Sequence, residues 1–140
     1  MPEREEDRTI TGHGKILVMD DEPLIRKMVM RMLLYLGYES ESAKDGAEAI
    51  QMYKQAKEAE KPYNAVIMDL TIPGGMGGKE AIKKLLEIDP EVKAIVSSGY
   101  SDGAVMANLQ EHGFKGILPK PFEDQSLGKV LHDVLKDEKE

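Results

Sequence analysis

The sequence contains no cysteine and no tryptophan, and only 5% of its residues are aromatic. Without cysteine, the chain can form no disulfide and offers no thiolate for metal binding or nucleophilic catalysis. No apolar run approaches the roughly 18 residues that a membrane-spanning helix needs. Positive charge is also in deficit, since the formal net charge is -7. Direct binding to nucleic acid is therefore not expected, because that affinity comes mainly from lysine and arginine.

The chain ends are charged, and the first residues lack the apolar core of a signal peptide. We therefore expect a cytoplasmic protein that contacts no membrane. The 140 residues, of which 41% are hydrophobic and 32% charged, fit one globular domain. That domain is expected over residues 15–136, between a flexible tail or linker at 1–14 and a charged tail at 137–140.

Short apolar runs alternate with amphipathic segments five times along the chain. Strands are expected near 15–20, 38–43, 63–69, 92–96 and 116–118. Helices are expected near 23–36, 45–60, 79–88, 103–112 and 123–136. This alternation predicts an α/β protein, a doubly wound (βα)₅ flavodoxin-like fold with a parallel five-stranded sheet in the order 2-1-3-4-5.

Two of the expected strands end in aspartate. The first delivers Asp20 and Asp21, and the third delivers Asp69. In the order 2-1-3-4-5, strands 1 and 3 lie side by side at the point where ligands bind such sheets. Three carboxylates that meet there raise one another's pKa or require a cation.

Hydroxyl and ammonium groups are expected at the same edge. The fourth strand delivers Ser97 and Ser98, and the fifth leads into Lys120. Such a set suits a hard divalent cation and a phosphoryl group, and a carboxylate can itself be the nucleophile that forms an aspartyl phosphate. Each residue alone also fits an ordinary role, such as a helix cap or a turn. Their arrival at one edge favours the functional interpretation.

The same residues resemble the signature of a known family, the receiver domain of two-component response regulators. The resemblance covers roughly residues 15–135 and rests on Asp20-Asp21, Asp69, Ser97 and Lys120-Pro121-Phe122. It implies a phosphoacceptor that signals rather than an enzyme with a separate substrate. Asp69 would take the phosphoryl group from a phosphohistidine on a histidine kinase or histidine phosphotransfer domain.

The resemblance also implies a metal site. Asp21 and Asp69 would ligate Mg²⁺ (or Mn²⁺) directly, Asp20 would contribute through water, and the backbone carbonyl of Thr71 would complete the set. Ser97 would hydrogen-bond one phosphoryl oxygen.

Lys120 would pair with another phosphoryl oxygen, and its bond to Pro121 would be cis. Ser98 remains the alternative to Ser97, although counting along the strand favours Ser97.

A partner surface is implied beside this site. Ile25, Met28, Pro121 and Phe122 occupy positions where receiver domains dock the helical bundle that carries the phosphohistidine. For Met28, a place in the core is equally compatible with the sequence, and methionine suits an adaptable surface. A downstream output domain or protein would then read the switched state.

The position that often holds an aromatic switch residue is occupied by Ile117, so that device is in question. Tyr100 is a substitute or simply a loop aromatic. Two rival functions stay open. An aspartyl phosphatase or phosphotransferase would commonly need an acid two residues after the nucleophile, where this chain has Thr71; a scaffold receiver would bind partners without phosphorylation. The glycine-rich stretches resemble receivers of hybrid sensor kinases.

Overall fold

The computed structural model describes residues 10–99 and 108–136. Its centre is a parallel five-stranded sheet in the order β2-β1-β3-β4-β5, which confirms the predicted topology. The strands are β1 (Lys15–Met19), β2 (Glu39–Ala43), β3 (Ala65–Asp69), β4 (Ala94–Ser98) and β5 (Gly116–Pro119). The carboxyl ends of all five strands therefore lie along one edge of the sheet.

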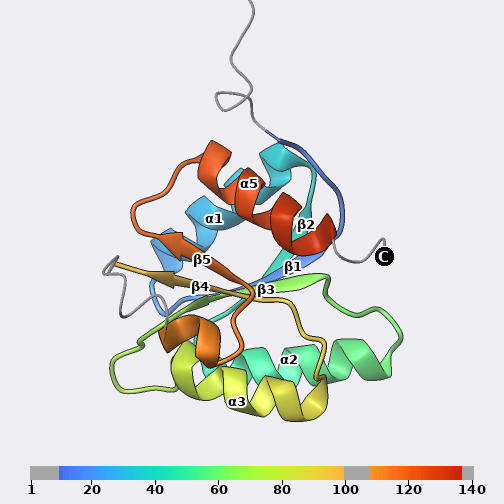
Figure 1. The fold of residues 1–140 in the computed structure, drawn as a ribbon, viewed down its shortest axis with the longest axis vertical. Coiled ribbons are helices and arrows are strands. Elements are labelled where there is room, and N and C mark those ends of the chain that lie inside the picture. The colour runs from blue at the N-terminus through green and yellow to red at the C-terminus, as the bar shows by residue number, and fades with distance from the viewer. Residues whose placement is uncertain (1–9, 100–107, 137–140) are drawn as a thin grey trace, which may run out of the picture.

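Helices cover both faces of the sheet. They are α1 (Pro23–Leu36), α2 (Gly46–Glu58), α3 (Gly78–Ile88) and α5 (Asp124–Leu135), and residues 108–111 are also helical. In Figure 1, α1 and α5 lie on one side of the sheet, while α2 and α3 lie on the other. Among the described residues, no helix combines the length and the apolar character that crossing a membrane requires.

Alternating side chains of the central strands fill two separate cores. In β1, Ile16 and Val18 pack into the cluster under α1 and α5. Leu17 and Met19 point the other way, into the cluster under α2 and α3. All four are at most 1% exposed. A strand that is covered on both faces must be apolar throughout, which is why the carboxylates stand just beyond its end.

The first helix has the predicted limits. Pro23 stands at its start, and Gly37 ends it with φ 103, a left-handed conformation that glycine adopts without steric cost. The segment before β1 packs against this end, because the Gly12 N–H donates to Leu36 O over 2.9 Å. Residues 10–14 thus contact the folded domain.

The fourth strand begins later than expected. The sequence predicts 92–96, whereas β4 runs from Ala94 to Ser98. Val92 is buried, but its N–H donates to Asp89 O in a turn and so cannot join the sheet. Most of the helix expected near 103–112, together with Tyr100, lies outside the described residues.

Candidate functional site

The turn after β1 holds Asp20 through several of its atoms. Its side chain is buried, and Oδ1 accepts a 2.9 Å hydrogen bond from the Glu22 N–H. Its backbone carbonyl accepts a 2.8 Å bond from Nη1 of Arg26. The Asp21 side chain, by contrast, is exposed and makes no hydrogen bond or ion pair within residues 10–99 and 108–136. Asp20 is therefore fixed, while Asp21 offers a free carboxylate.

Parallel pairing brings Asp69 to the same edge. Met19 of β1 lies opposite Met68 of β3, so the aspartates that follow these two residues are neighbours. One carboxylate oxygen from each of Asp20, Asp21 and Asp69 can be chosen so that the three lie within 4.8 Å of one another. The structure thus brings together the three acids expected from the sequence.

Lys120, directly after β5, reaches into this acidic cluster. Its Nζ lies 3.4 Å from Oδ2 of Asp20 and 3.5 Å from Oδ2 of Asp69. Its backbone N–H donates to Ser98 O over 2.8 Å, and the Lys120–Pro121 bond is cis, as the resemblance implies. One ammonium group is therefore shared between two carboxylates.

Ser97 lies level with Asp69, because the two residues are paired in the β3–β4 register. Its Oγ is buried and has no hydrogen-bond partner among the described residues. Together with Asp20, Asp69 and Lys120 it lines a crevice of about 10 Å³. A buried hydroxyl that lacks a partner is uncommon and points to a missing acceptor or donor.

The electrostatics of Asp69 reflect this crowding. Burial raises the pKa of its carboxyl above the usual range, and the neighbouring Asp20 carboxylate raises it further. The Lys120 ammonium and the backbone N–H of Thr71 lower the pKa and offset part of that rise. Ionised Asp69 is thus held at an energetic cost that a cation would relieve.

The donor set fits a hard divalent cation. Three carboxylates from Asp20, Asp21 and Asp69 converge, and within the described residues Lys120 is paired with only two of them. Mg²⁺ and Mn²⁺ prefer such oxygen ligands, and the cluster contains no nitrogen or sulfur ligand that would favour a softer metal. The Ser97 hydroxyl, which has no partner in the part of the chain that the structure describes, and the Lys120 ammonium suit anionic oxygens.

Of the remaining predicted residues, Ile25 and Phe122 line the same crevice as Asp69. Met28 is 47% exposed, so it lies on the surface rather than in the core. Ile25 and Phe122 are partly buried and pack under α1 and α5, and Pro121 is exposed. Ile117 is partly buried and packs against the core under α2 and α3.

The sequence reasoning missed Arg26. It lies on the first turn of α1, and its guanidinium reaches back to Asp20 O. The available signal was its spacing, since an arginine four residues after Glu22 faces the same side of the helix as the turn that precedes it.

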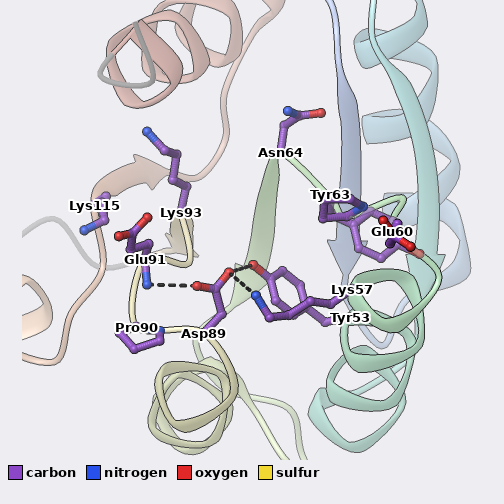
Figure 2. Close-up of a pocket in the computed structure, with 11 residues that line it drawn as sticks. Tyr53, Lys57, Glu60, Tyr63, Asn64, Asp89, Pro90, Glu91, Lys93 and Lys115 are labelled. Atoms are coloured by element: carbon purple, nitrogen blue, oxygen red, sulfur yellow. Dashed lines mark hydrogen bonds and ion pairs between the residues drawn. The ribbon is translucent and has the colours of Figure 1, made fainter. Parts of the chain in front are cut away.

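A second cluster of charged side chains lines a cavity of about 890 Å³ at the opposite, amino edge of the sheet. Figure 2 shows Asp89 at its centre, where Oδ2 accepts a 2.7 Å hydrogen bond from Tyr53 and lies 4.0 Å from Nζ of Lys57. The N–H of Glu91 donates to Oδ1 of Asp89. These groups are paired with one another, whereas in the cluster around Asp69 one ammonium group is shared by two carboxylates.

Comparison with known proteins gives a consistent result. The family described as "Response regulator receiver domain" matches residues 16–132. The chemotaxis protein CheY of Thermotoga maritima is 33% identical over 123 residues, which cover 87% of this chain and 98% of that protein. Sensor kinase CckA of Brucella abortus is 29% identical over 91% of this chain but only 13% of the kinase.

Solved structures share the fold. A response regulator receiver domain protein from Clostridium thermocellum superposes with a TM-score of 0.79 at 25% identity, covering 90% of this chain and 97% of that one. The receiver domain of a sensor histidine kinase from Pseudomonas aeruginosa has a TM-score of 0.76 at 23% identity, covering 89% of this chain and 99% of that one. In that kinase receiver domain, a magnesium ion is coordinated in the active site cleft.

Proposed function

Because this chain belongs to the response regulator receiver domain family, we propose that Asp69 is its phosphoacceptor. Receiver domains are signalling domains of two-component systems, and their relatives include sensor kinases. The proposed donor is a phosphohistidine on a histidine kinase or a histidine phosphotransfer domain. The phosphorylated chain would then act on a downstream output domain or protein.

One observation carries this proposal: Asp69 lies between an ammonium group and a buried hydroxyl that has no partner among the described residues. Lys120 Nζ is 3.5 Å from its Oδ2, and Ser97 Oγ lines the same crevice. A phosphoryl group on Asp69 would bring oxygens that accept from both donors. The Lys120 pair with Asp20 would then loosen as the ammonium turns toward the new charge.

The proposed transfer moves one phosphoryl group between two nucleophiles. A carboxylate oxygen of Asp69 forms a bond to phosphorus while the bond from phosphorus to the histidine nitrogen breaks, and the imidazole departs with the electron pair. Asp69 must be ionised to attack. Lys120 favours that form, because it lowers the pKa that burial raises.

The residues that would hold Mg²⁺ (or Mn²⁺) are Asp20, Asp21 and Asp69, with the backbone carbonyl of Thr71 as a further ligand. The convergence of the three carboxylates within 4.8 Å supports this assignment. When bound, the ion would supply positive charge that balances the carboxylates and the phosphoryl oxygens.

The surface beside the site is the proposed docking place of the phosphohistidine partner. Exposed Met28 and Pro121 would provide adaptable and rigid contacts respectively, while Ile25 and Phe122 are partly buried and line the crevice that contains Asp69. We assign the receiver domain to residues 15–136 and a cytoplasmic location to the protein. Residues 1–14 would be a flexible tail or linker whose last five residues pack on the domain, and 137–140 a charged tail.

Intact mass spectrometry tests the proposal. The protein is incubated with a small acyl phosphate, with Mg²⁺ or with EDTA, and a single phosphoryl adduct is expected only with Mg²⁺. The adduct should be lost in Asp69→Ala. It should persist in Asp89→Ala, a matched variant that removes a carboxylate at the opposite edge of the sheet.

Other outcomes identify other functions. Catalytic hydrolysis of unrelated phosphate monoesters without an accumulated adduct would indicate a phosphatase or phosphotransferase. Absence of an adduct with acyl phosphate and with a phosphorylated histidine phosphotransfer domain would overturn phosphorylation and leave the scaffold function.

A further inference from the structure

We propose that Arg26 is a positioning residue for the metal site, acting on Asp21 through the backbone of Asp20. This inference deepens the proposed function and rests on it. The Arg26 guanidinium contacts the backbone of the site rather than a carboxylate, because Nη1 donates to the carbonyl oxygen of Asp20 over 2.8 Å.

The peptide plane between Asp20 and Asp21 transmits this contact. The carbonyl of Asp20 and the N–H of Asp21 belong to the same rigid peptide unit. A bond that fixes the direction of that carbonyl therefore restricts the plane from which the Asp21 side chain starts. The donor is a charged guanidinium, and charge-assisted hydrogen bonds are about twice as strong as neutral ones.

Within residues 10–99 and 108–136, no side chain holds the Asp21 carboxylate. Asp20 is held at its side chain by the Glu22 N–H and by Lys120. The exposed Asp21 side chain has no hydrogen bond or ion pair with any described residue. The backbone therefore sets the direction of the Asp21 Cα–Cβ bond, and the Arg26 guanidinium donates to this backbone at Asp20 O.

The helix that carries Arg26 is tied to the same turn. Glu22, which precedes α1, makes no capping hydrogen bond with its side chain. The Arg26 N–H donates to Glu22 O over 3.0 Å, so Arg26 joins the start of α1 to the turn through both its backbone and its guanidinium. The guanidinium of Arg26 thus adds a side-chain contact between the turn and the start of α1.

Positioning and charge predict effects of opposite sign, which makes the proposal decidable. A guanidinium near a cation site repels Mg²⁺, so removal of its charge alone would tighten Mg²⁺ binding. Removal of its hydrogen bond loosens the peptide unit that carries Asp21, so ordering that unit on binding costs entropy and weakens Mg²⁺ binding.

The test measures Mg²⁺ affinity by calorimetric titration without any phosphoryl donor. Arg26→Met should weaken Mg²⁺ binding about tenfold, the scale of one charge-assisted hydrogen bond. The matched control is Lys27→Met, which removes one exposed positive charge from the same helix and breaks no hydrogen bond or ion pair among the described residues. It should change the affinity less than twofold. Equal affinities in the two variants, or tighter binding in Arg26→Met, would overturn the proposal.

Two further readouts separate positioning from damage to the fold. In the metal-free protein, NMR relaxation should show a more mobile Asp21 amide in Arg26→Met and an unchanged one in Lys27→Met. In phosphorylation assays, Arg26→Met should need more Mg²⁺ for half-maximal rate but reach the wild-type rate at saturation. If Arg26→Met does not fold, Arg26→Gln, whose shorter side chain cannot span the same distance, decides by the same criteria.

The outcome does not depend on phosphorylation. If the wild-type protein forms no adduct, the proposed function fails, yet the Mg²⁺ affinities and the mobility of Asp21 still decide the role of Arg26. If the wild type is phosphorylated and Arg26→Met binds Mg²⁺ as Lys27→Met does, only the positioning role fails.

Discussion

Both edges of the sheet carry clusters of charged and hydroxyl side chains, but within the described residues only at the amino edge do these groups satisfy one another's hydrogen bonds. At the amino edge, Asp89 accepts hydrogen bonds from Tyr53 and from a backbone N–H, and Lys57 lies 4.0 Å away. On the same edge, Tyr63 donates a hydrogen bond to Glu41, and Nζ of Lys15 lies 4.6 Å from the centre of the Tyr63 ring. These groups satisfy one another without any ligand.

At the carboxyl edge the same kinds of group are left incomplete. Three carboxylates converge, Lys120 pairs with two of them, and among the described residues the Ser97 hydroxyl has no partner. Folded proteins tolerate such arrangements mainly where function requires them. A cluster of charges thus marks a ligand site when its own members cannot satisfy it, and a structural site when they can.

The largest expected effect comes from removing one carboxylate at each edge. Asp69→Ala should abolish the phosphoryl adduct, because the nucleophile is gone. Asp89→Ala should leave the adduct intact, because Asp89 lies at the opposite edge of the sheet and, within the described residues, is hydrogen-bonded only to groups there. Mass spectrometry after incubation with an acyl phosphate measures both. Loss of the adduct in both variants would contradict the claim that only the carboxyl edge takes part in phosphorylation.

The amino-edge variant Asp89→Ala should lower the stability of the protein, although it leaves phosphorylation intact. Asp89→Ala leaves the Tyr53 hydroxyl without its acceptor, and loss of a hydrogen bond to a charged group costs about 1.5–3 kcal/mol of unfolding free energy. Urea denaturation measures this loss. Restoring an apolar fit with the double variant Tyr53→Phe/Asp89→Ala should recover part of it, and no recovery would count against this hydrogen bond as the cause.

Ser97→Ala should slow phosphorylation about tenfold, the equivalent of one lost hydrogen bond to a charged oxygen. It should not lower the stability of the unphosphorylated protein, because Ser97 Oγ has no partner there among the described residues. Ser98→Ala is the adjacent control and should keep the phosphorylation rate. Rates followed by mass spectrometry would refute the assignment if Ser98→Ala were the slower variant.

The smallest expected effect is a stabilisation. Burial raises the pKa of Asp69 in the folded state, so stability is lost as pH rises through the unfolded and then the folded pKa. At neutral pH without Mg²⁺, Asp69→Asn should therefore melt a few degrees above the wild type. The difference should shrink in acid, where Asp69 is protonated in both states, and thermal melts across pH test this sign.

Much of this architecture could be predicted from the sequence because it depends on local patterns. Alternating apolar runs identify the strands, and Pro23 and Gly37 bracket α1. Parallel order then places Asp20 and Asp69 together without any knowledge of side-chain contacts. The predicted start of β4 was wrong because Val92 is apolar like the strand residues that follow it, although its N–H is used in a turn.

The parts that could not be predicted depend on side-chain reach. Nothing in the spacing of Arg26 and Asp20 shows that the guanidinium bonds to a carbonyl rather than to solvent. Whether Met28 lies in the core or on the surface depends on how α1 is rotated against the sheet, since α1 carries more apolar residues than one buried face requires. The docking role of Met28 stays a prediction, as does the readout at Ile117.

The central claim is that Asp69 itself carries the phosphoryl group, and locating the modification tests it most directly. The protein is phosphorylated with an acyl phosphate and Mg²⁺, reduced with borohydride, digested and sequenced by mass spectrometry. Reduction converts an aspartyl phosphate to homoserine, so we predict homoserine at position 69 and unmodified aspartate at positions 20, 21 and 89. An adduct carried by any other residue, with position 69 unchanged, would contradict the claim.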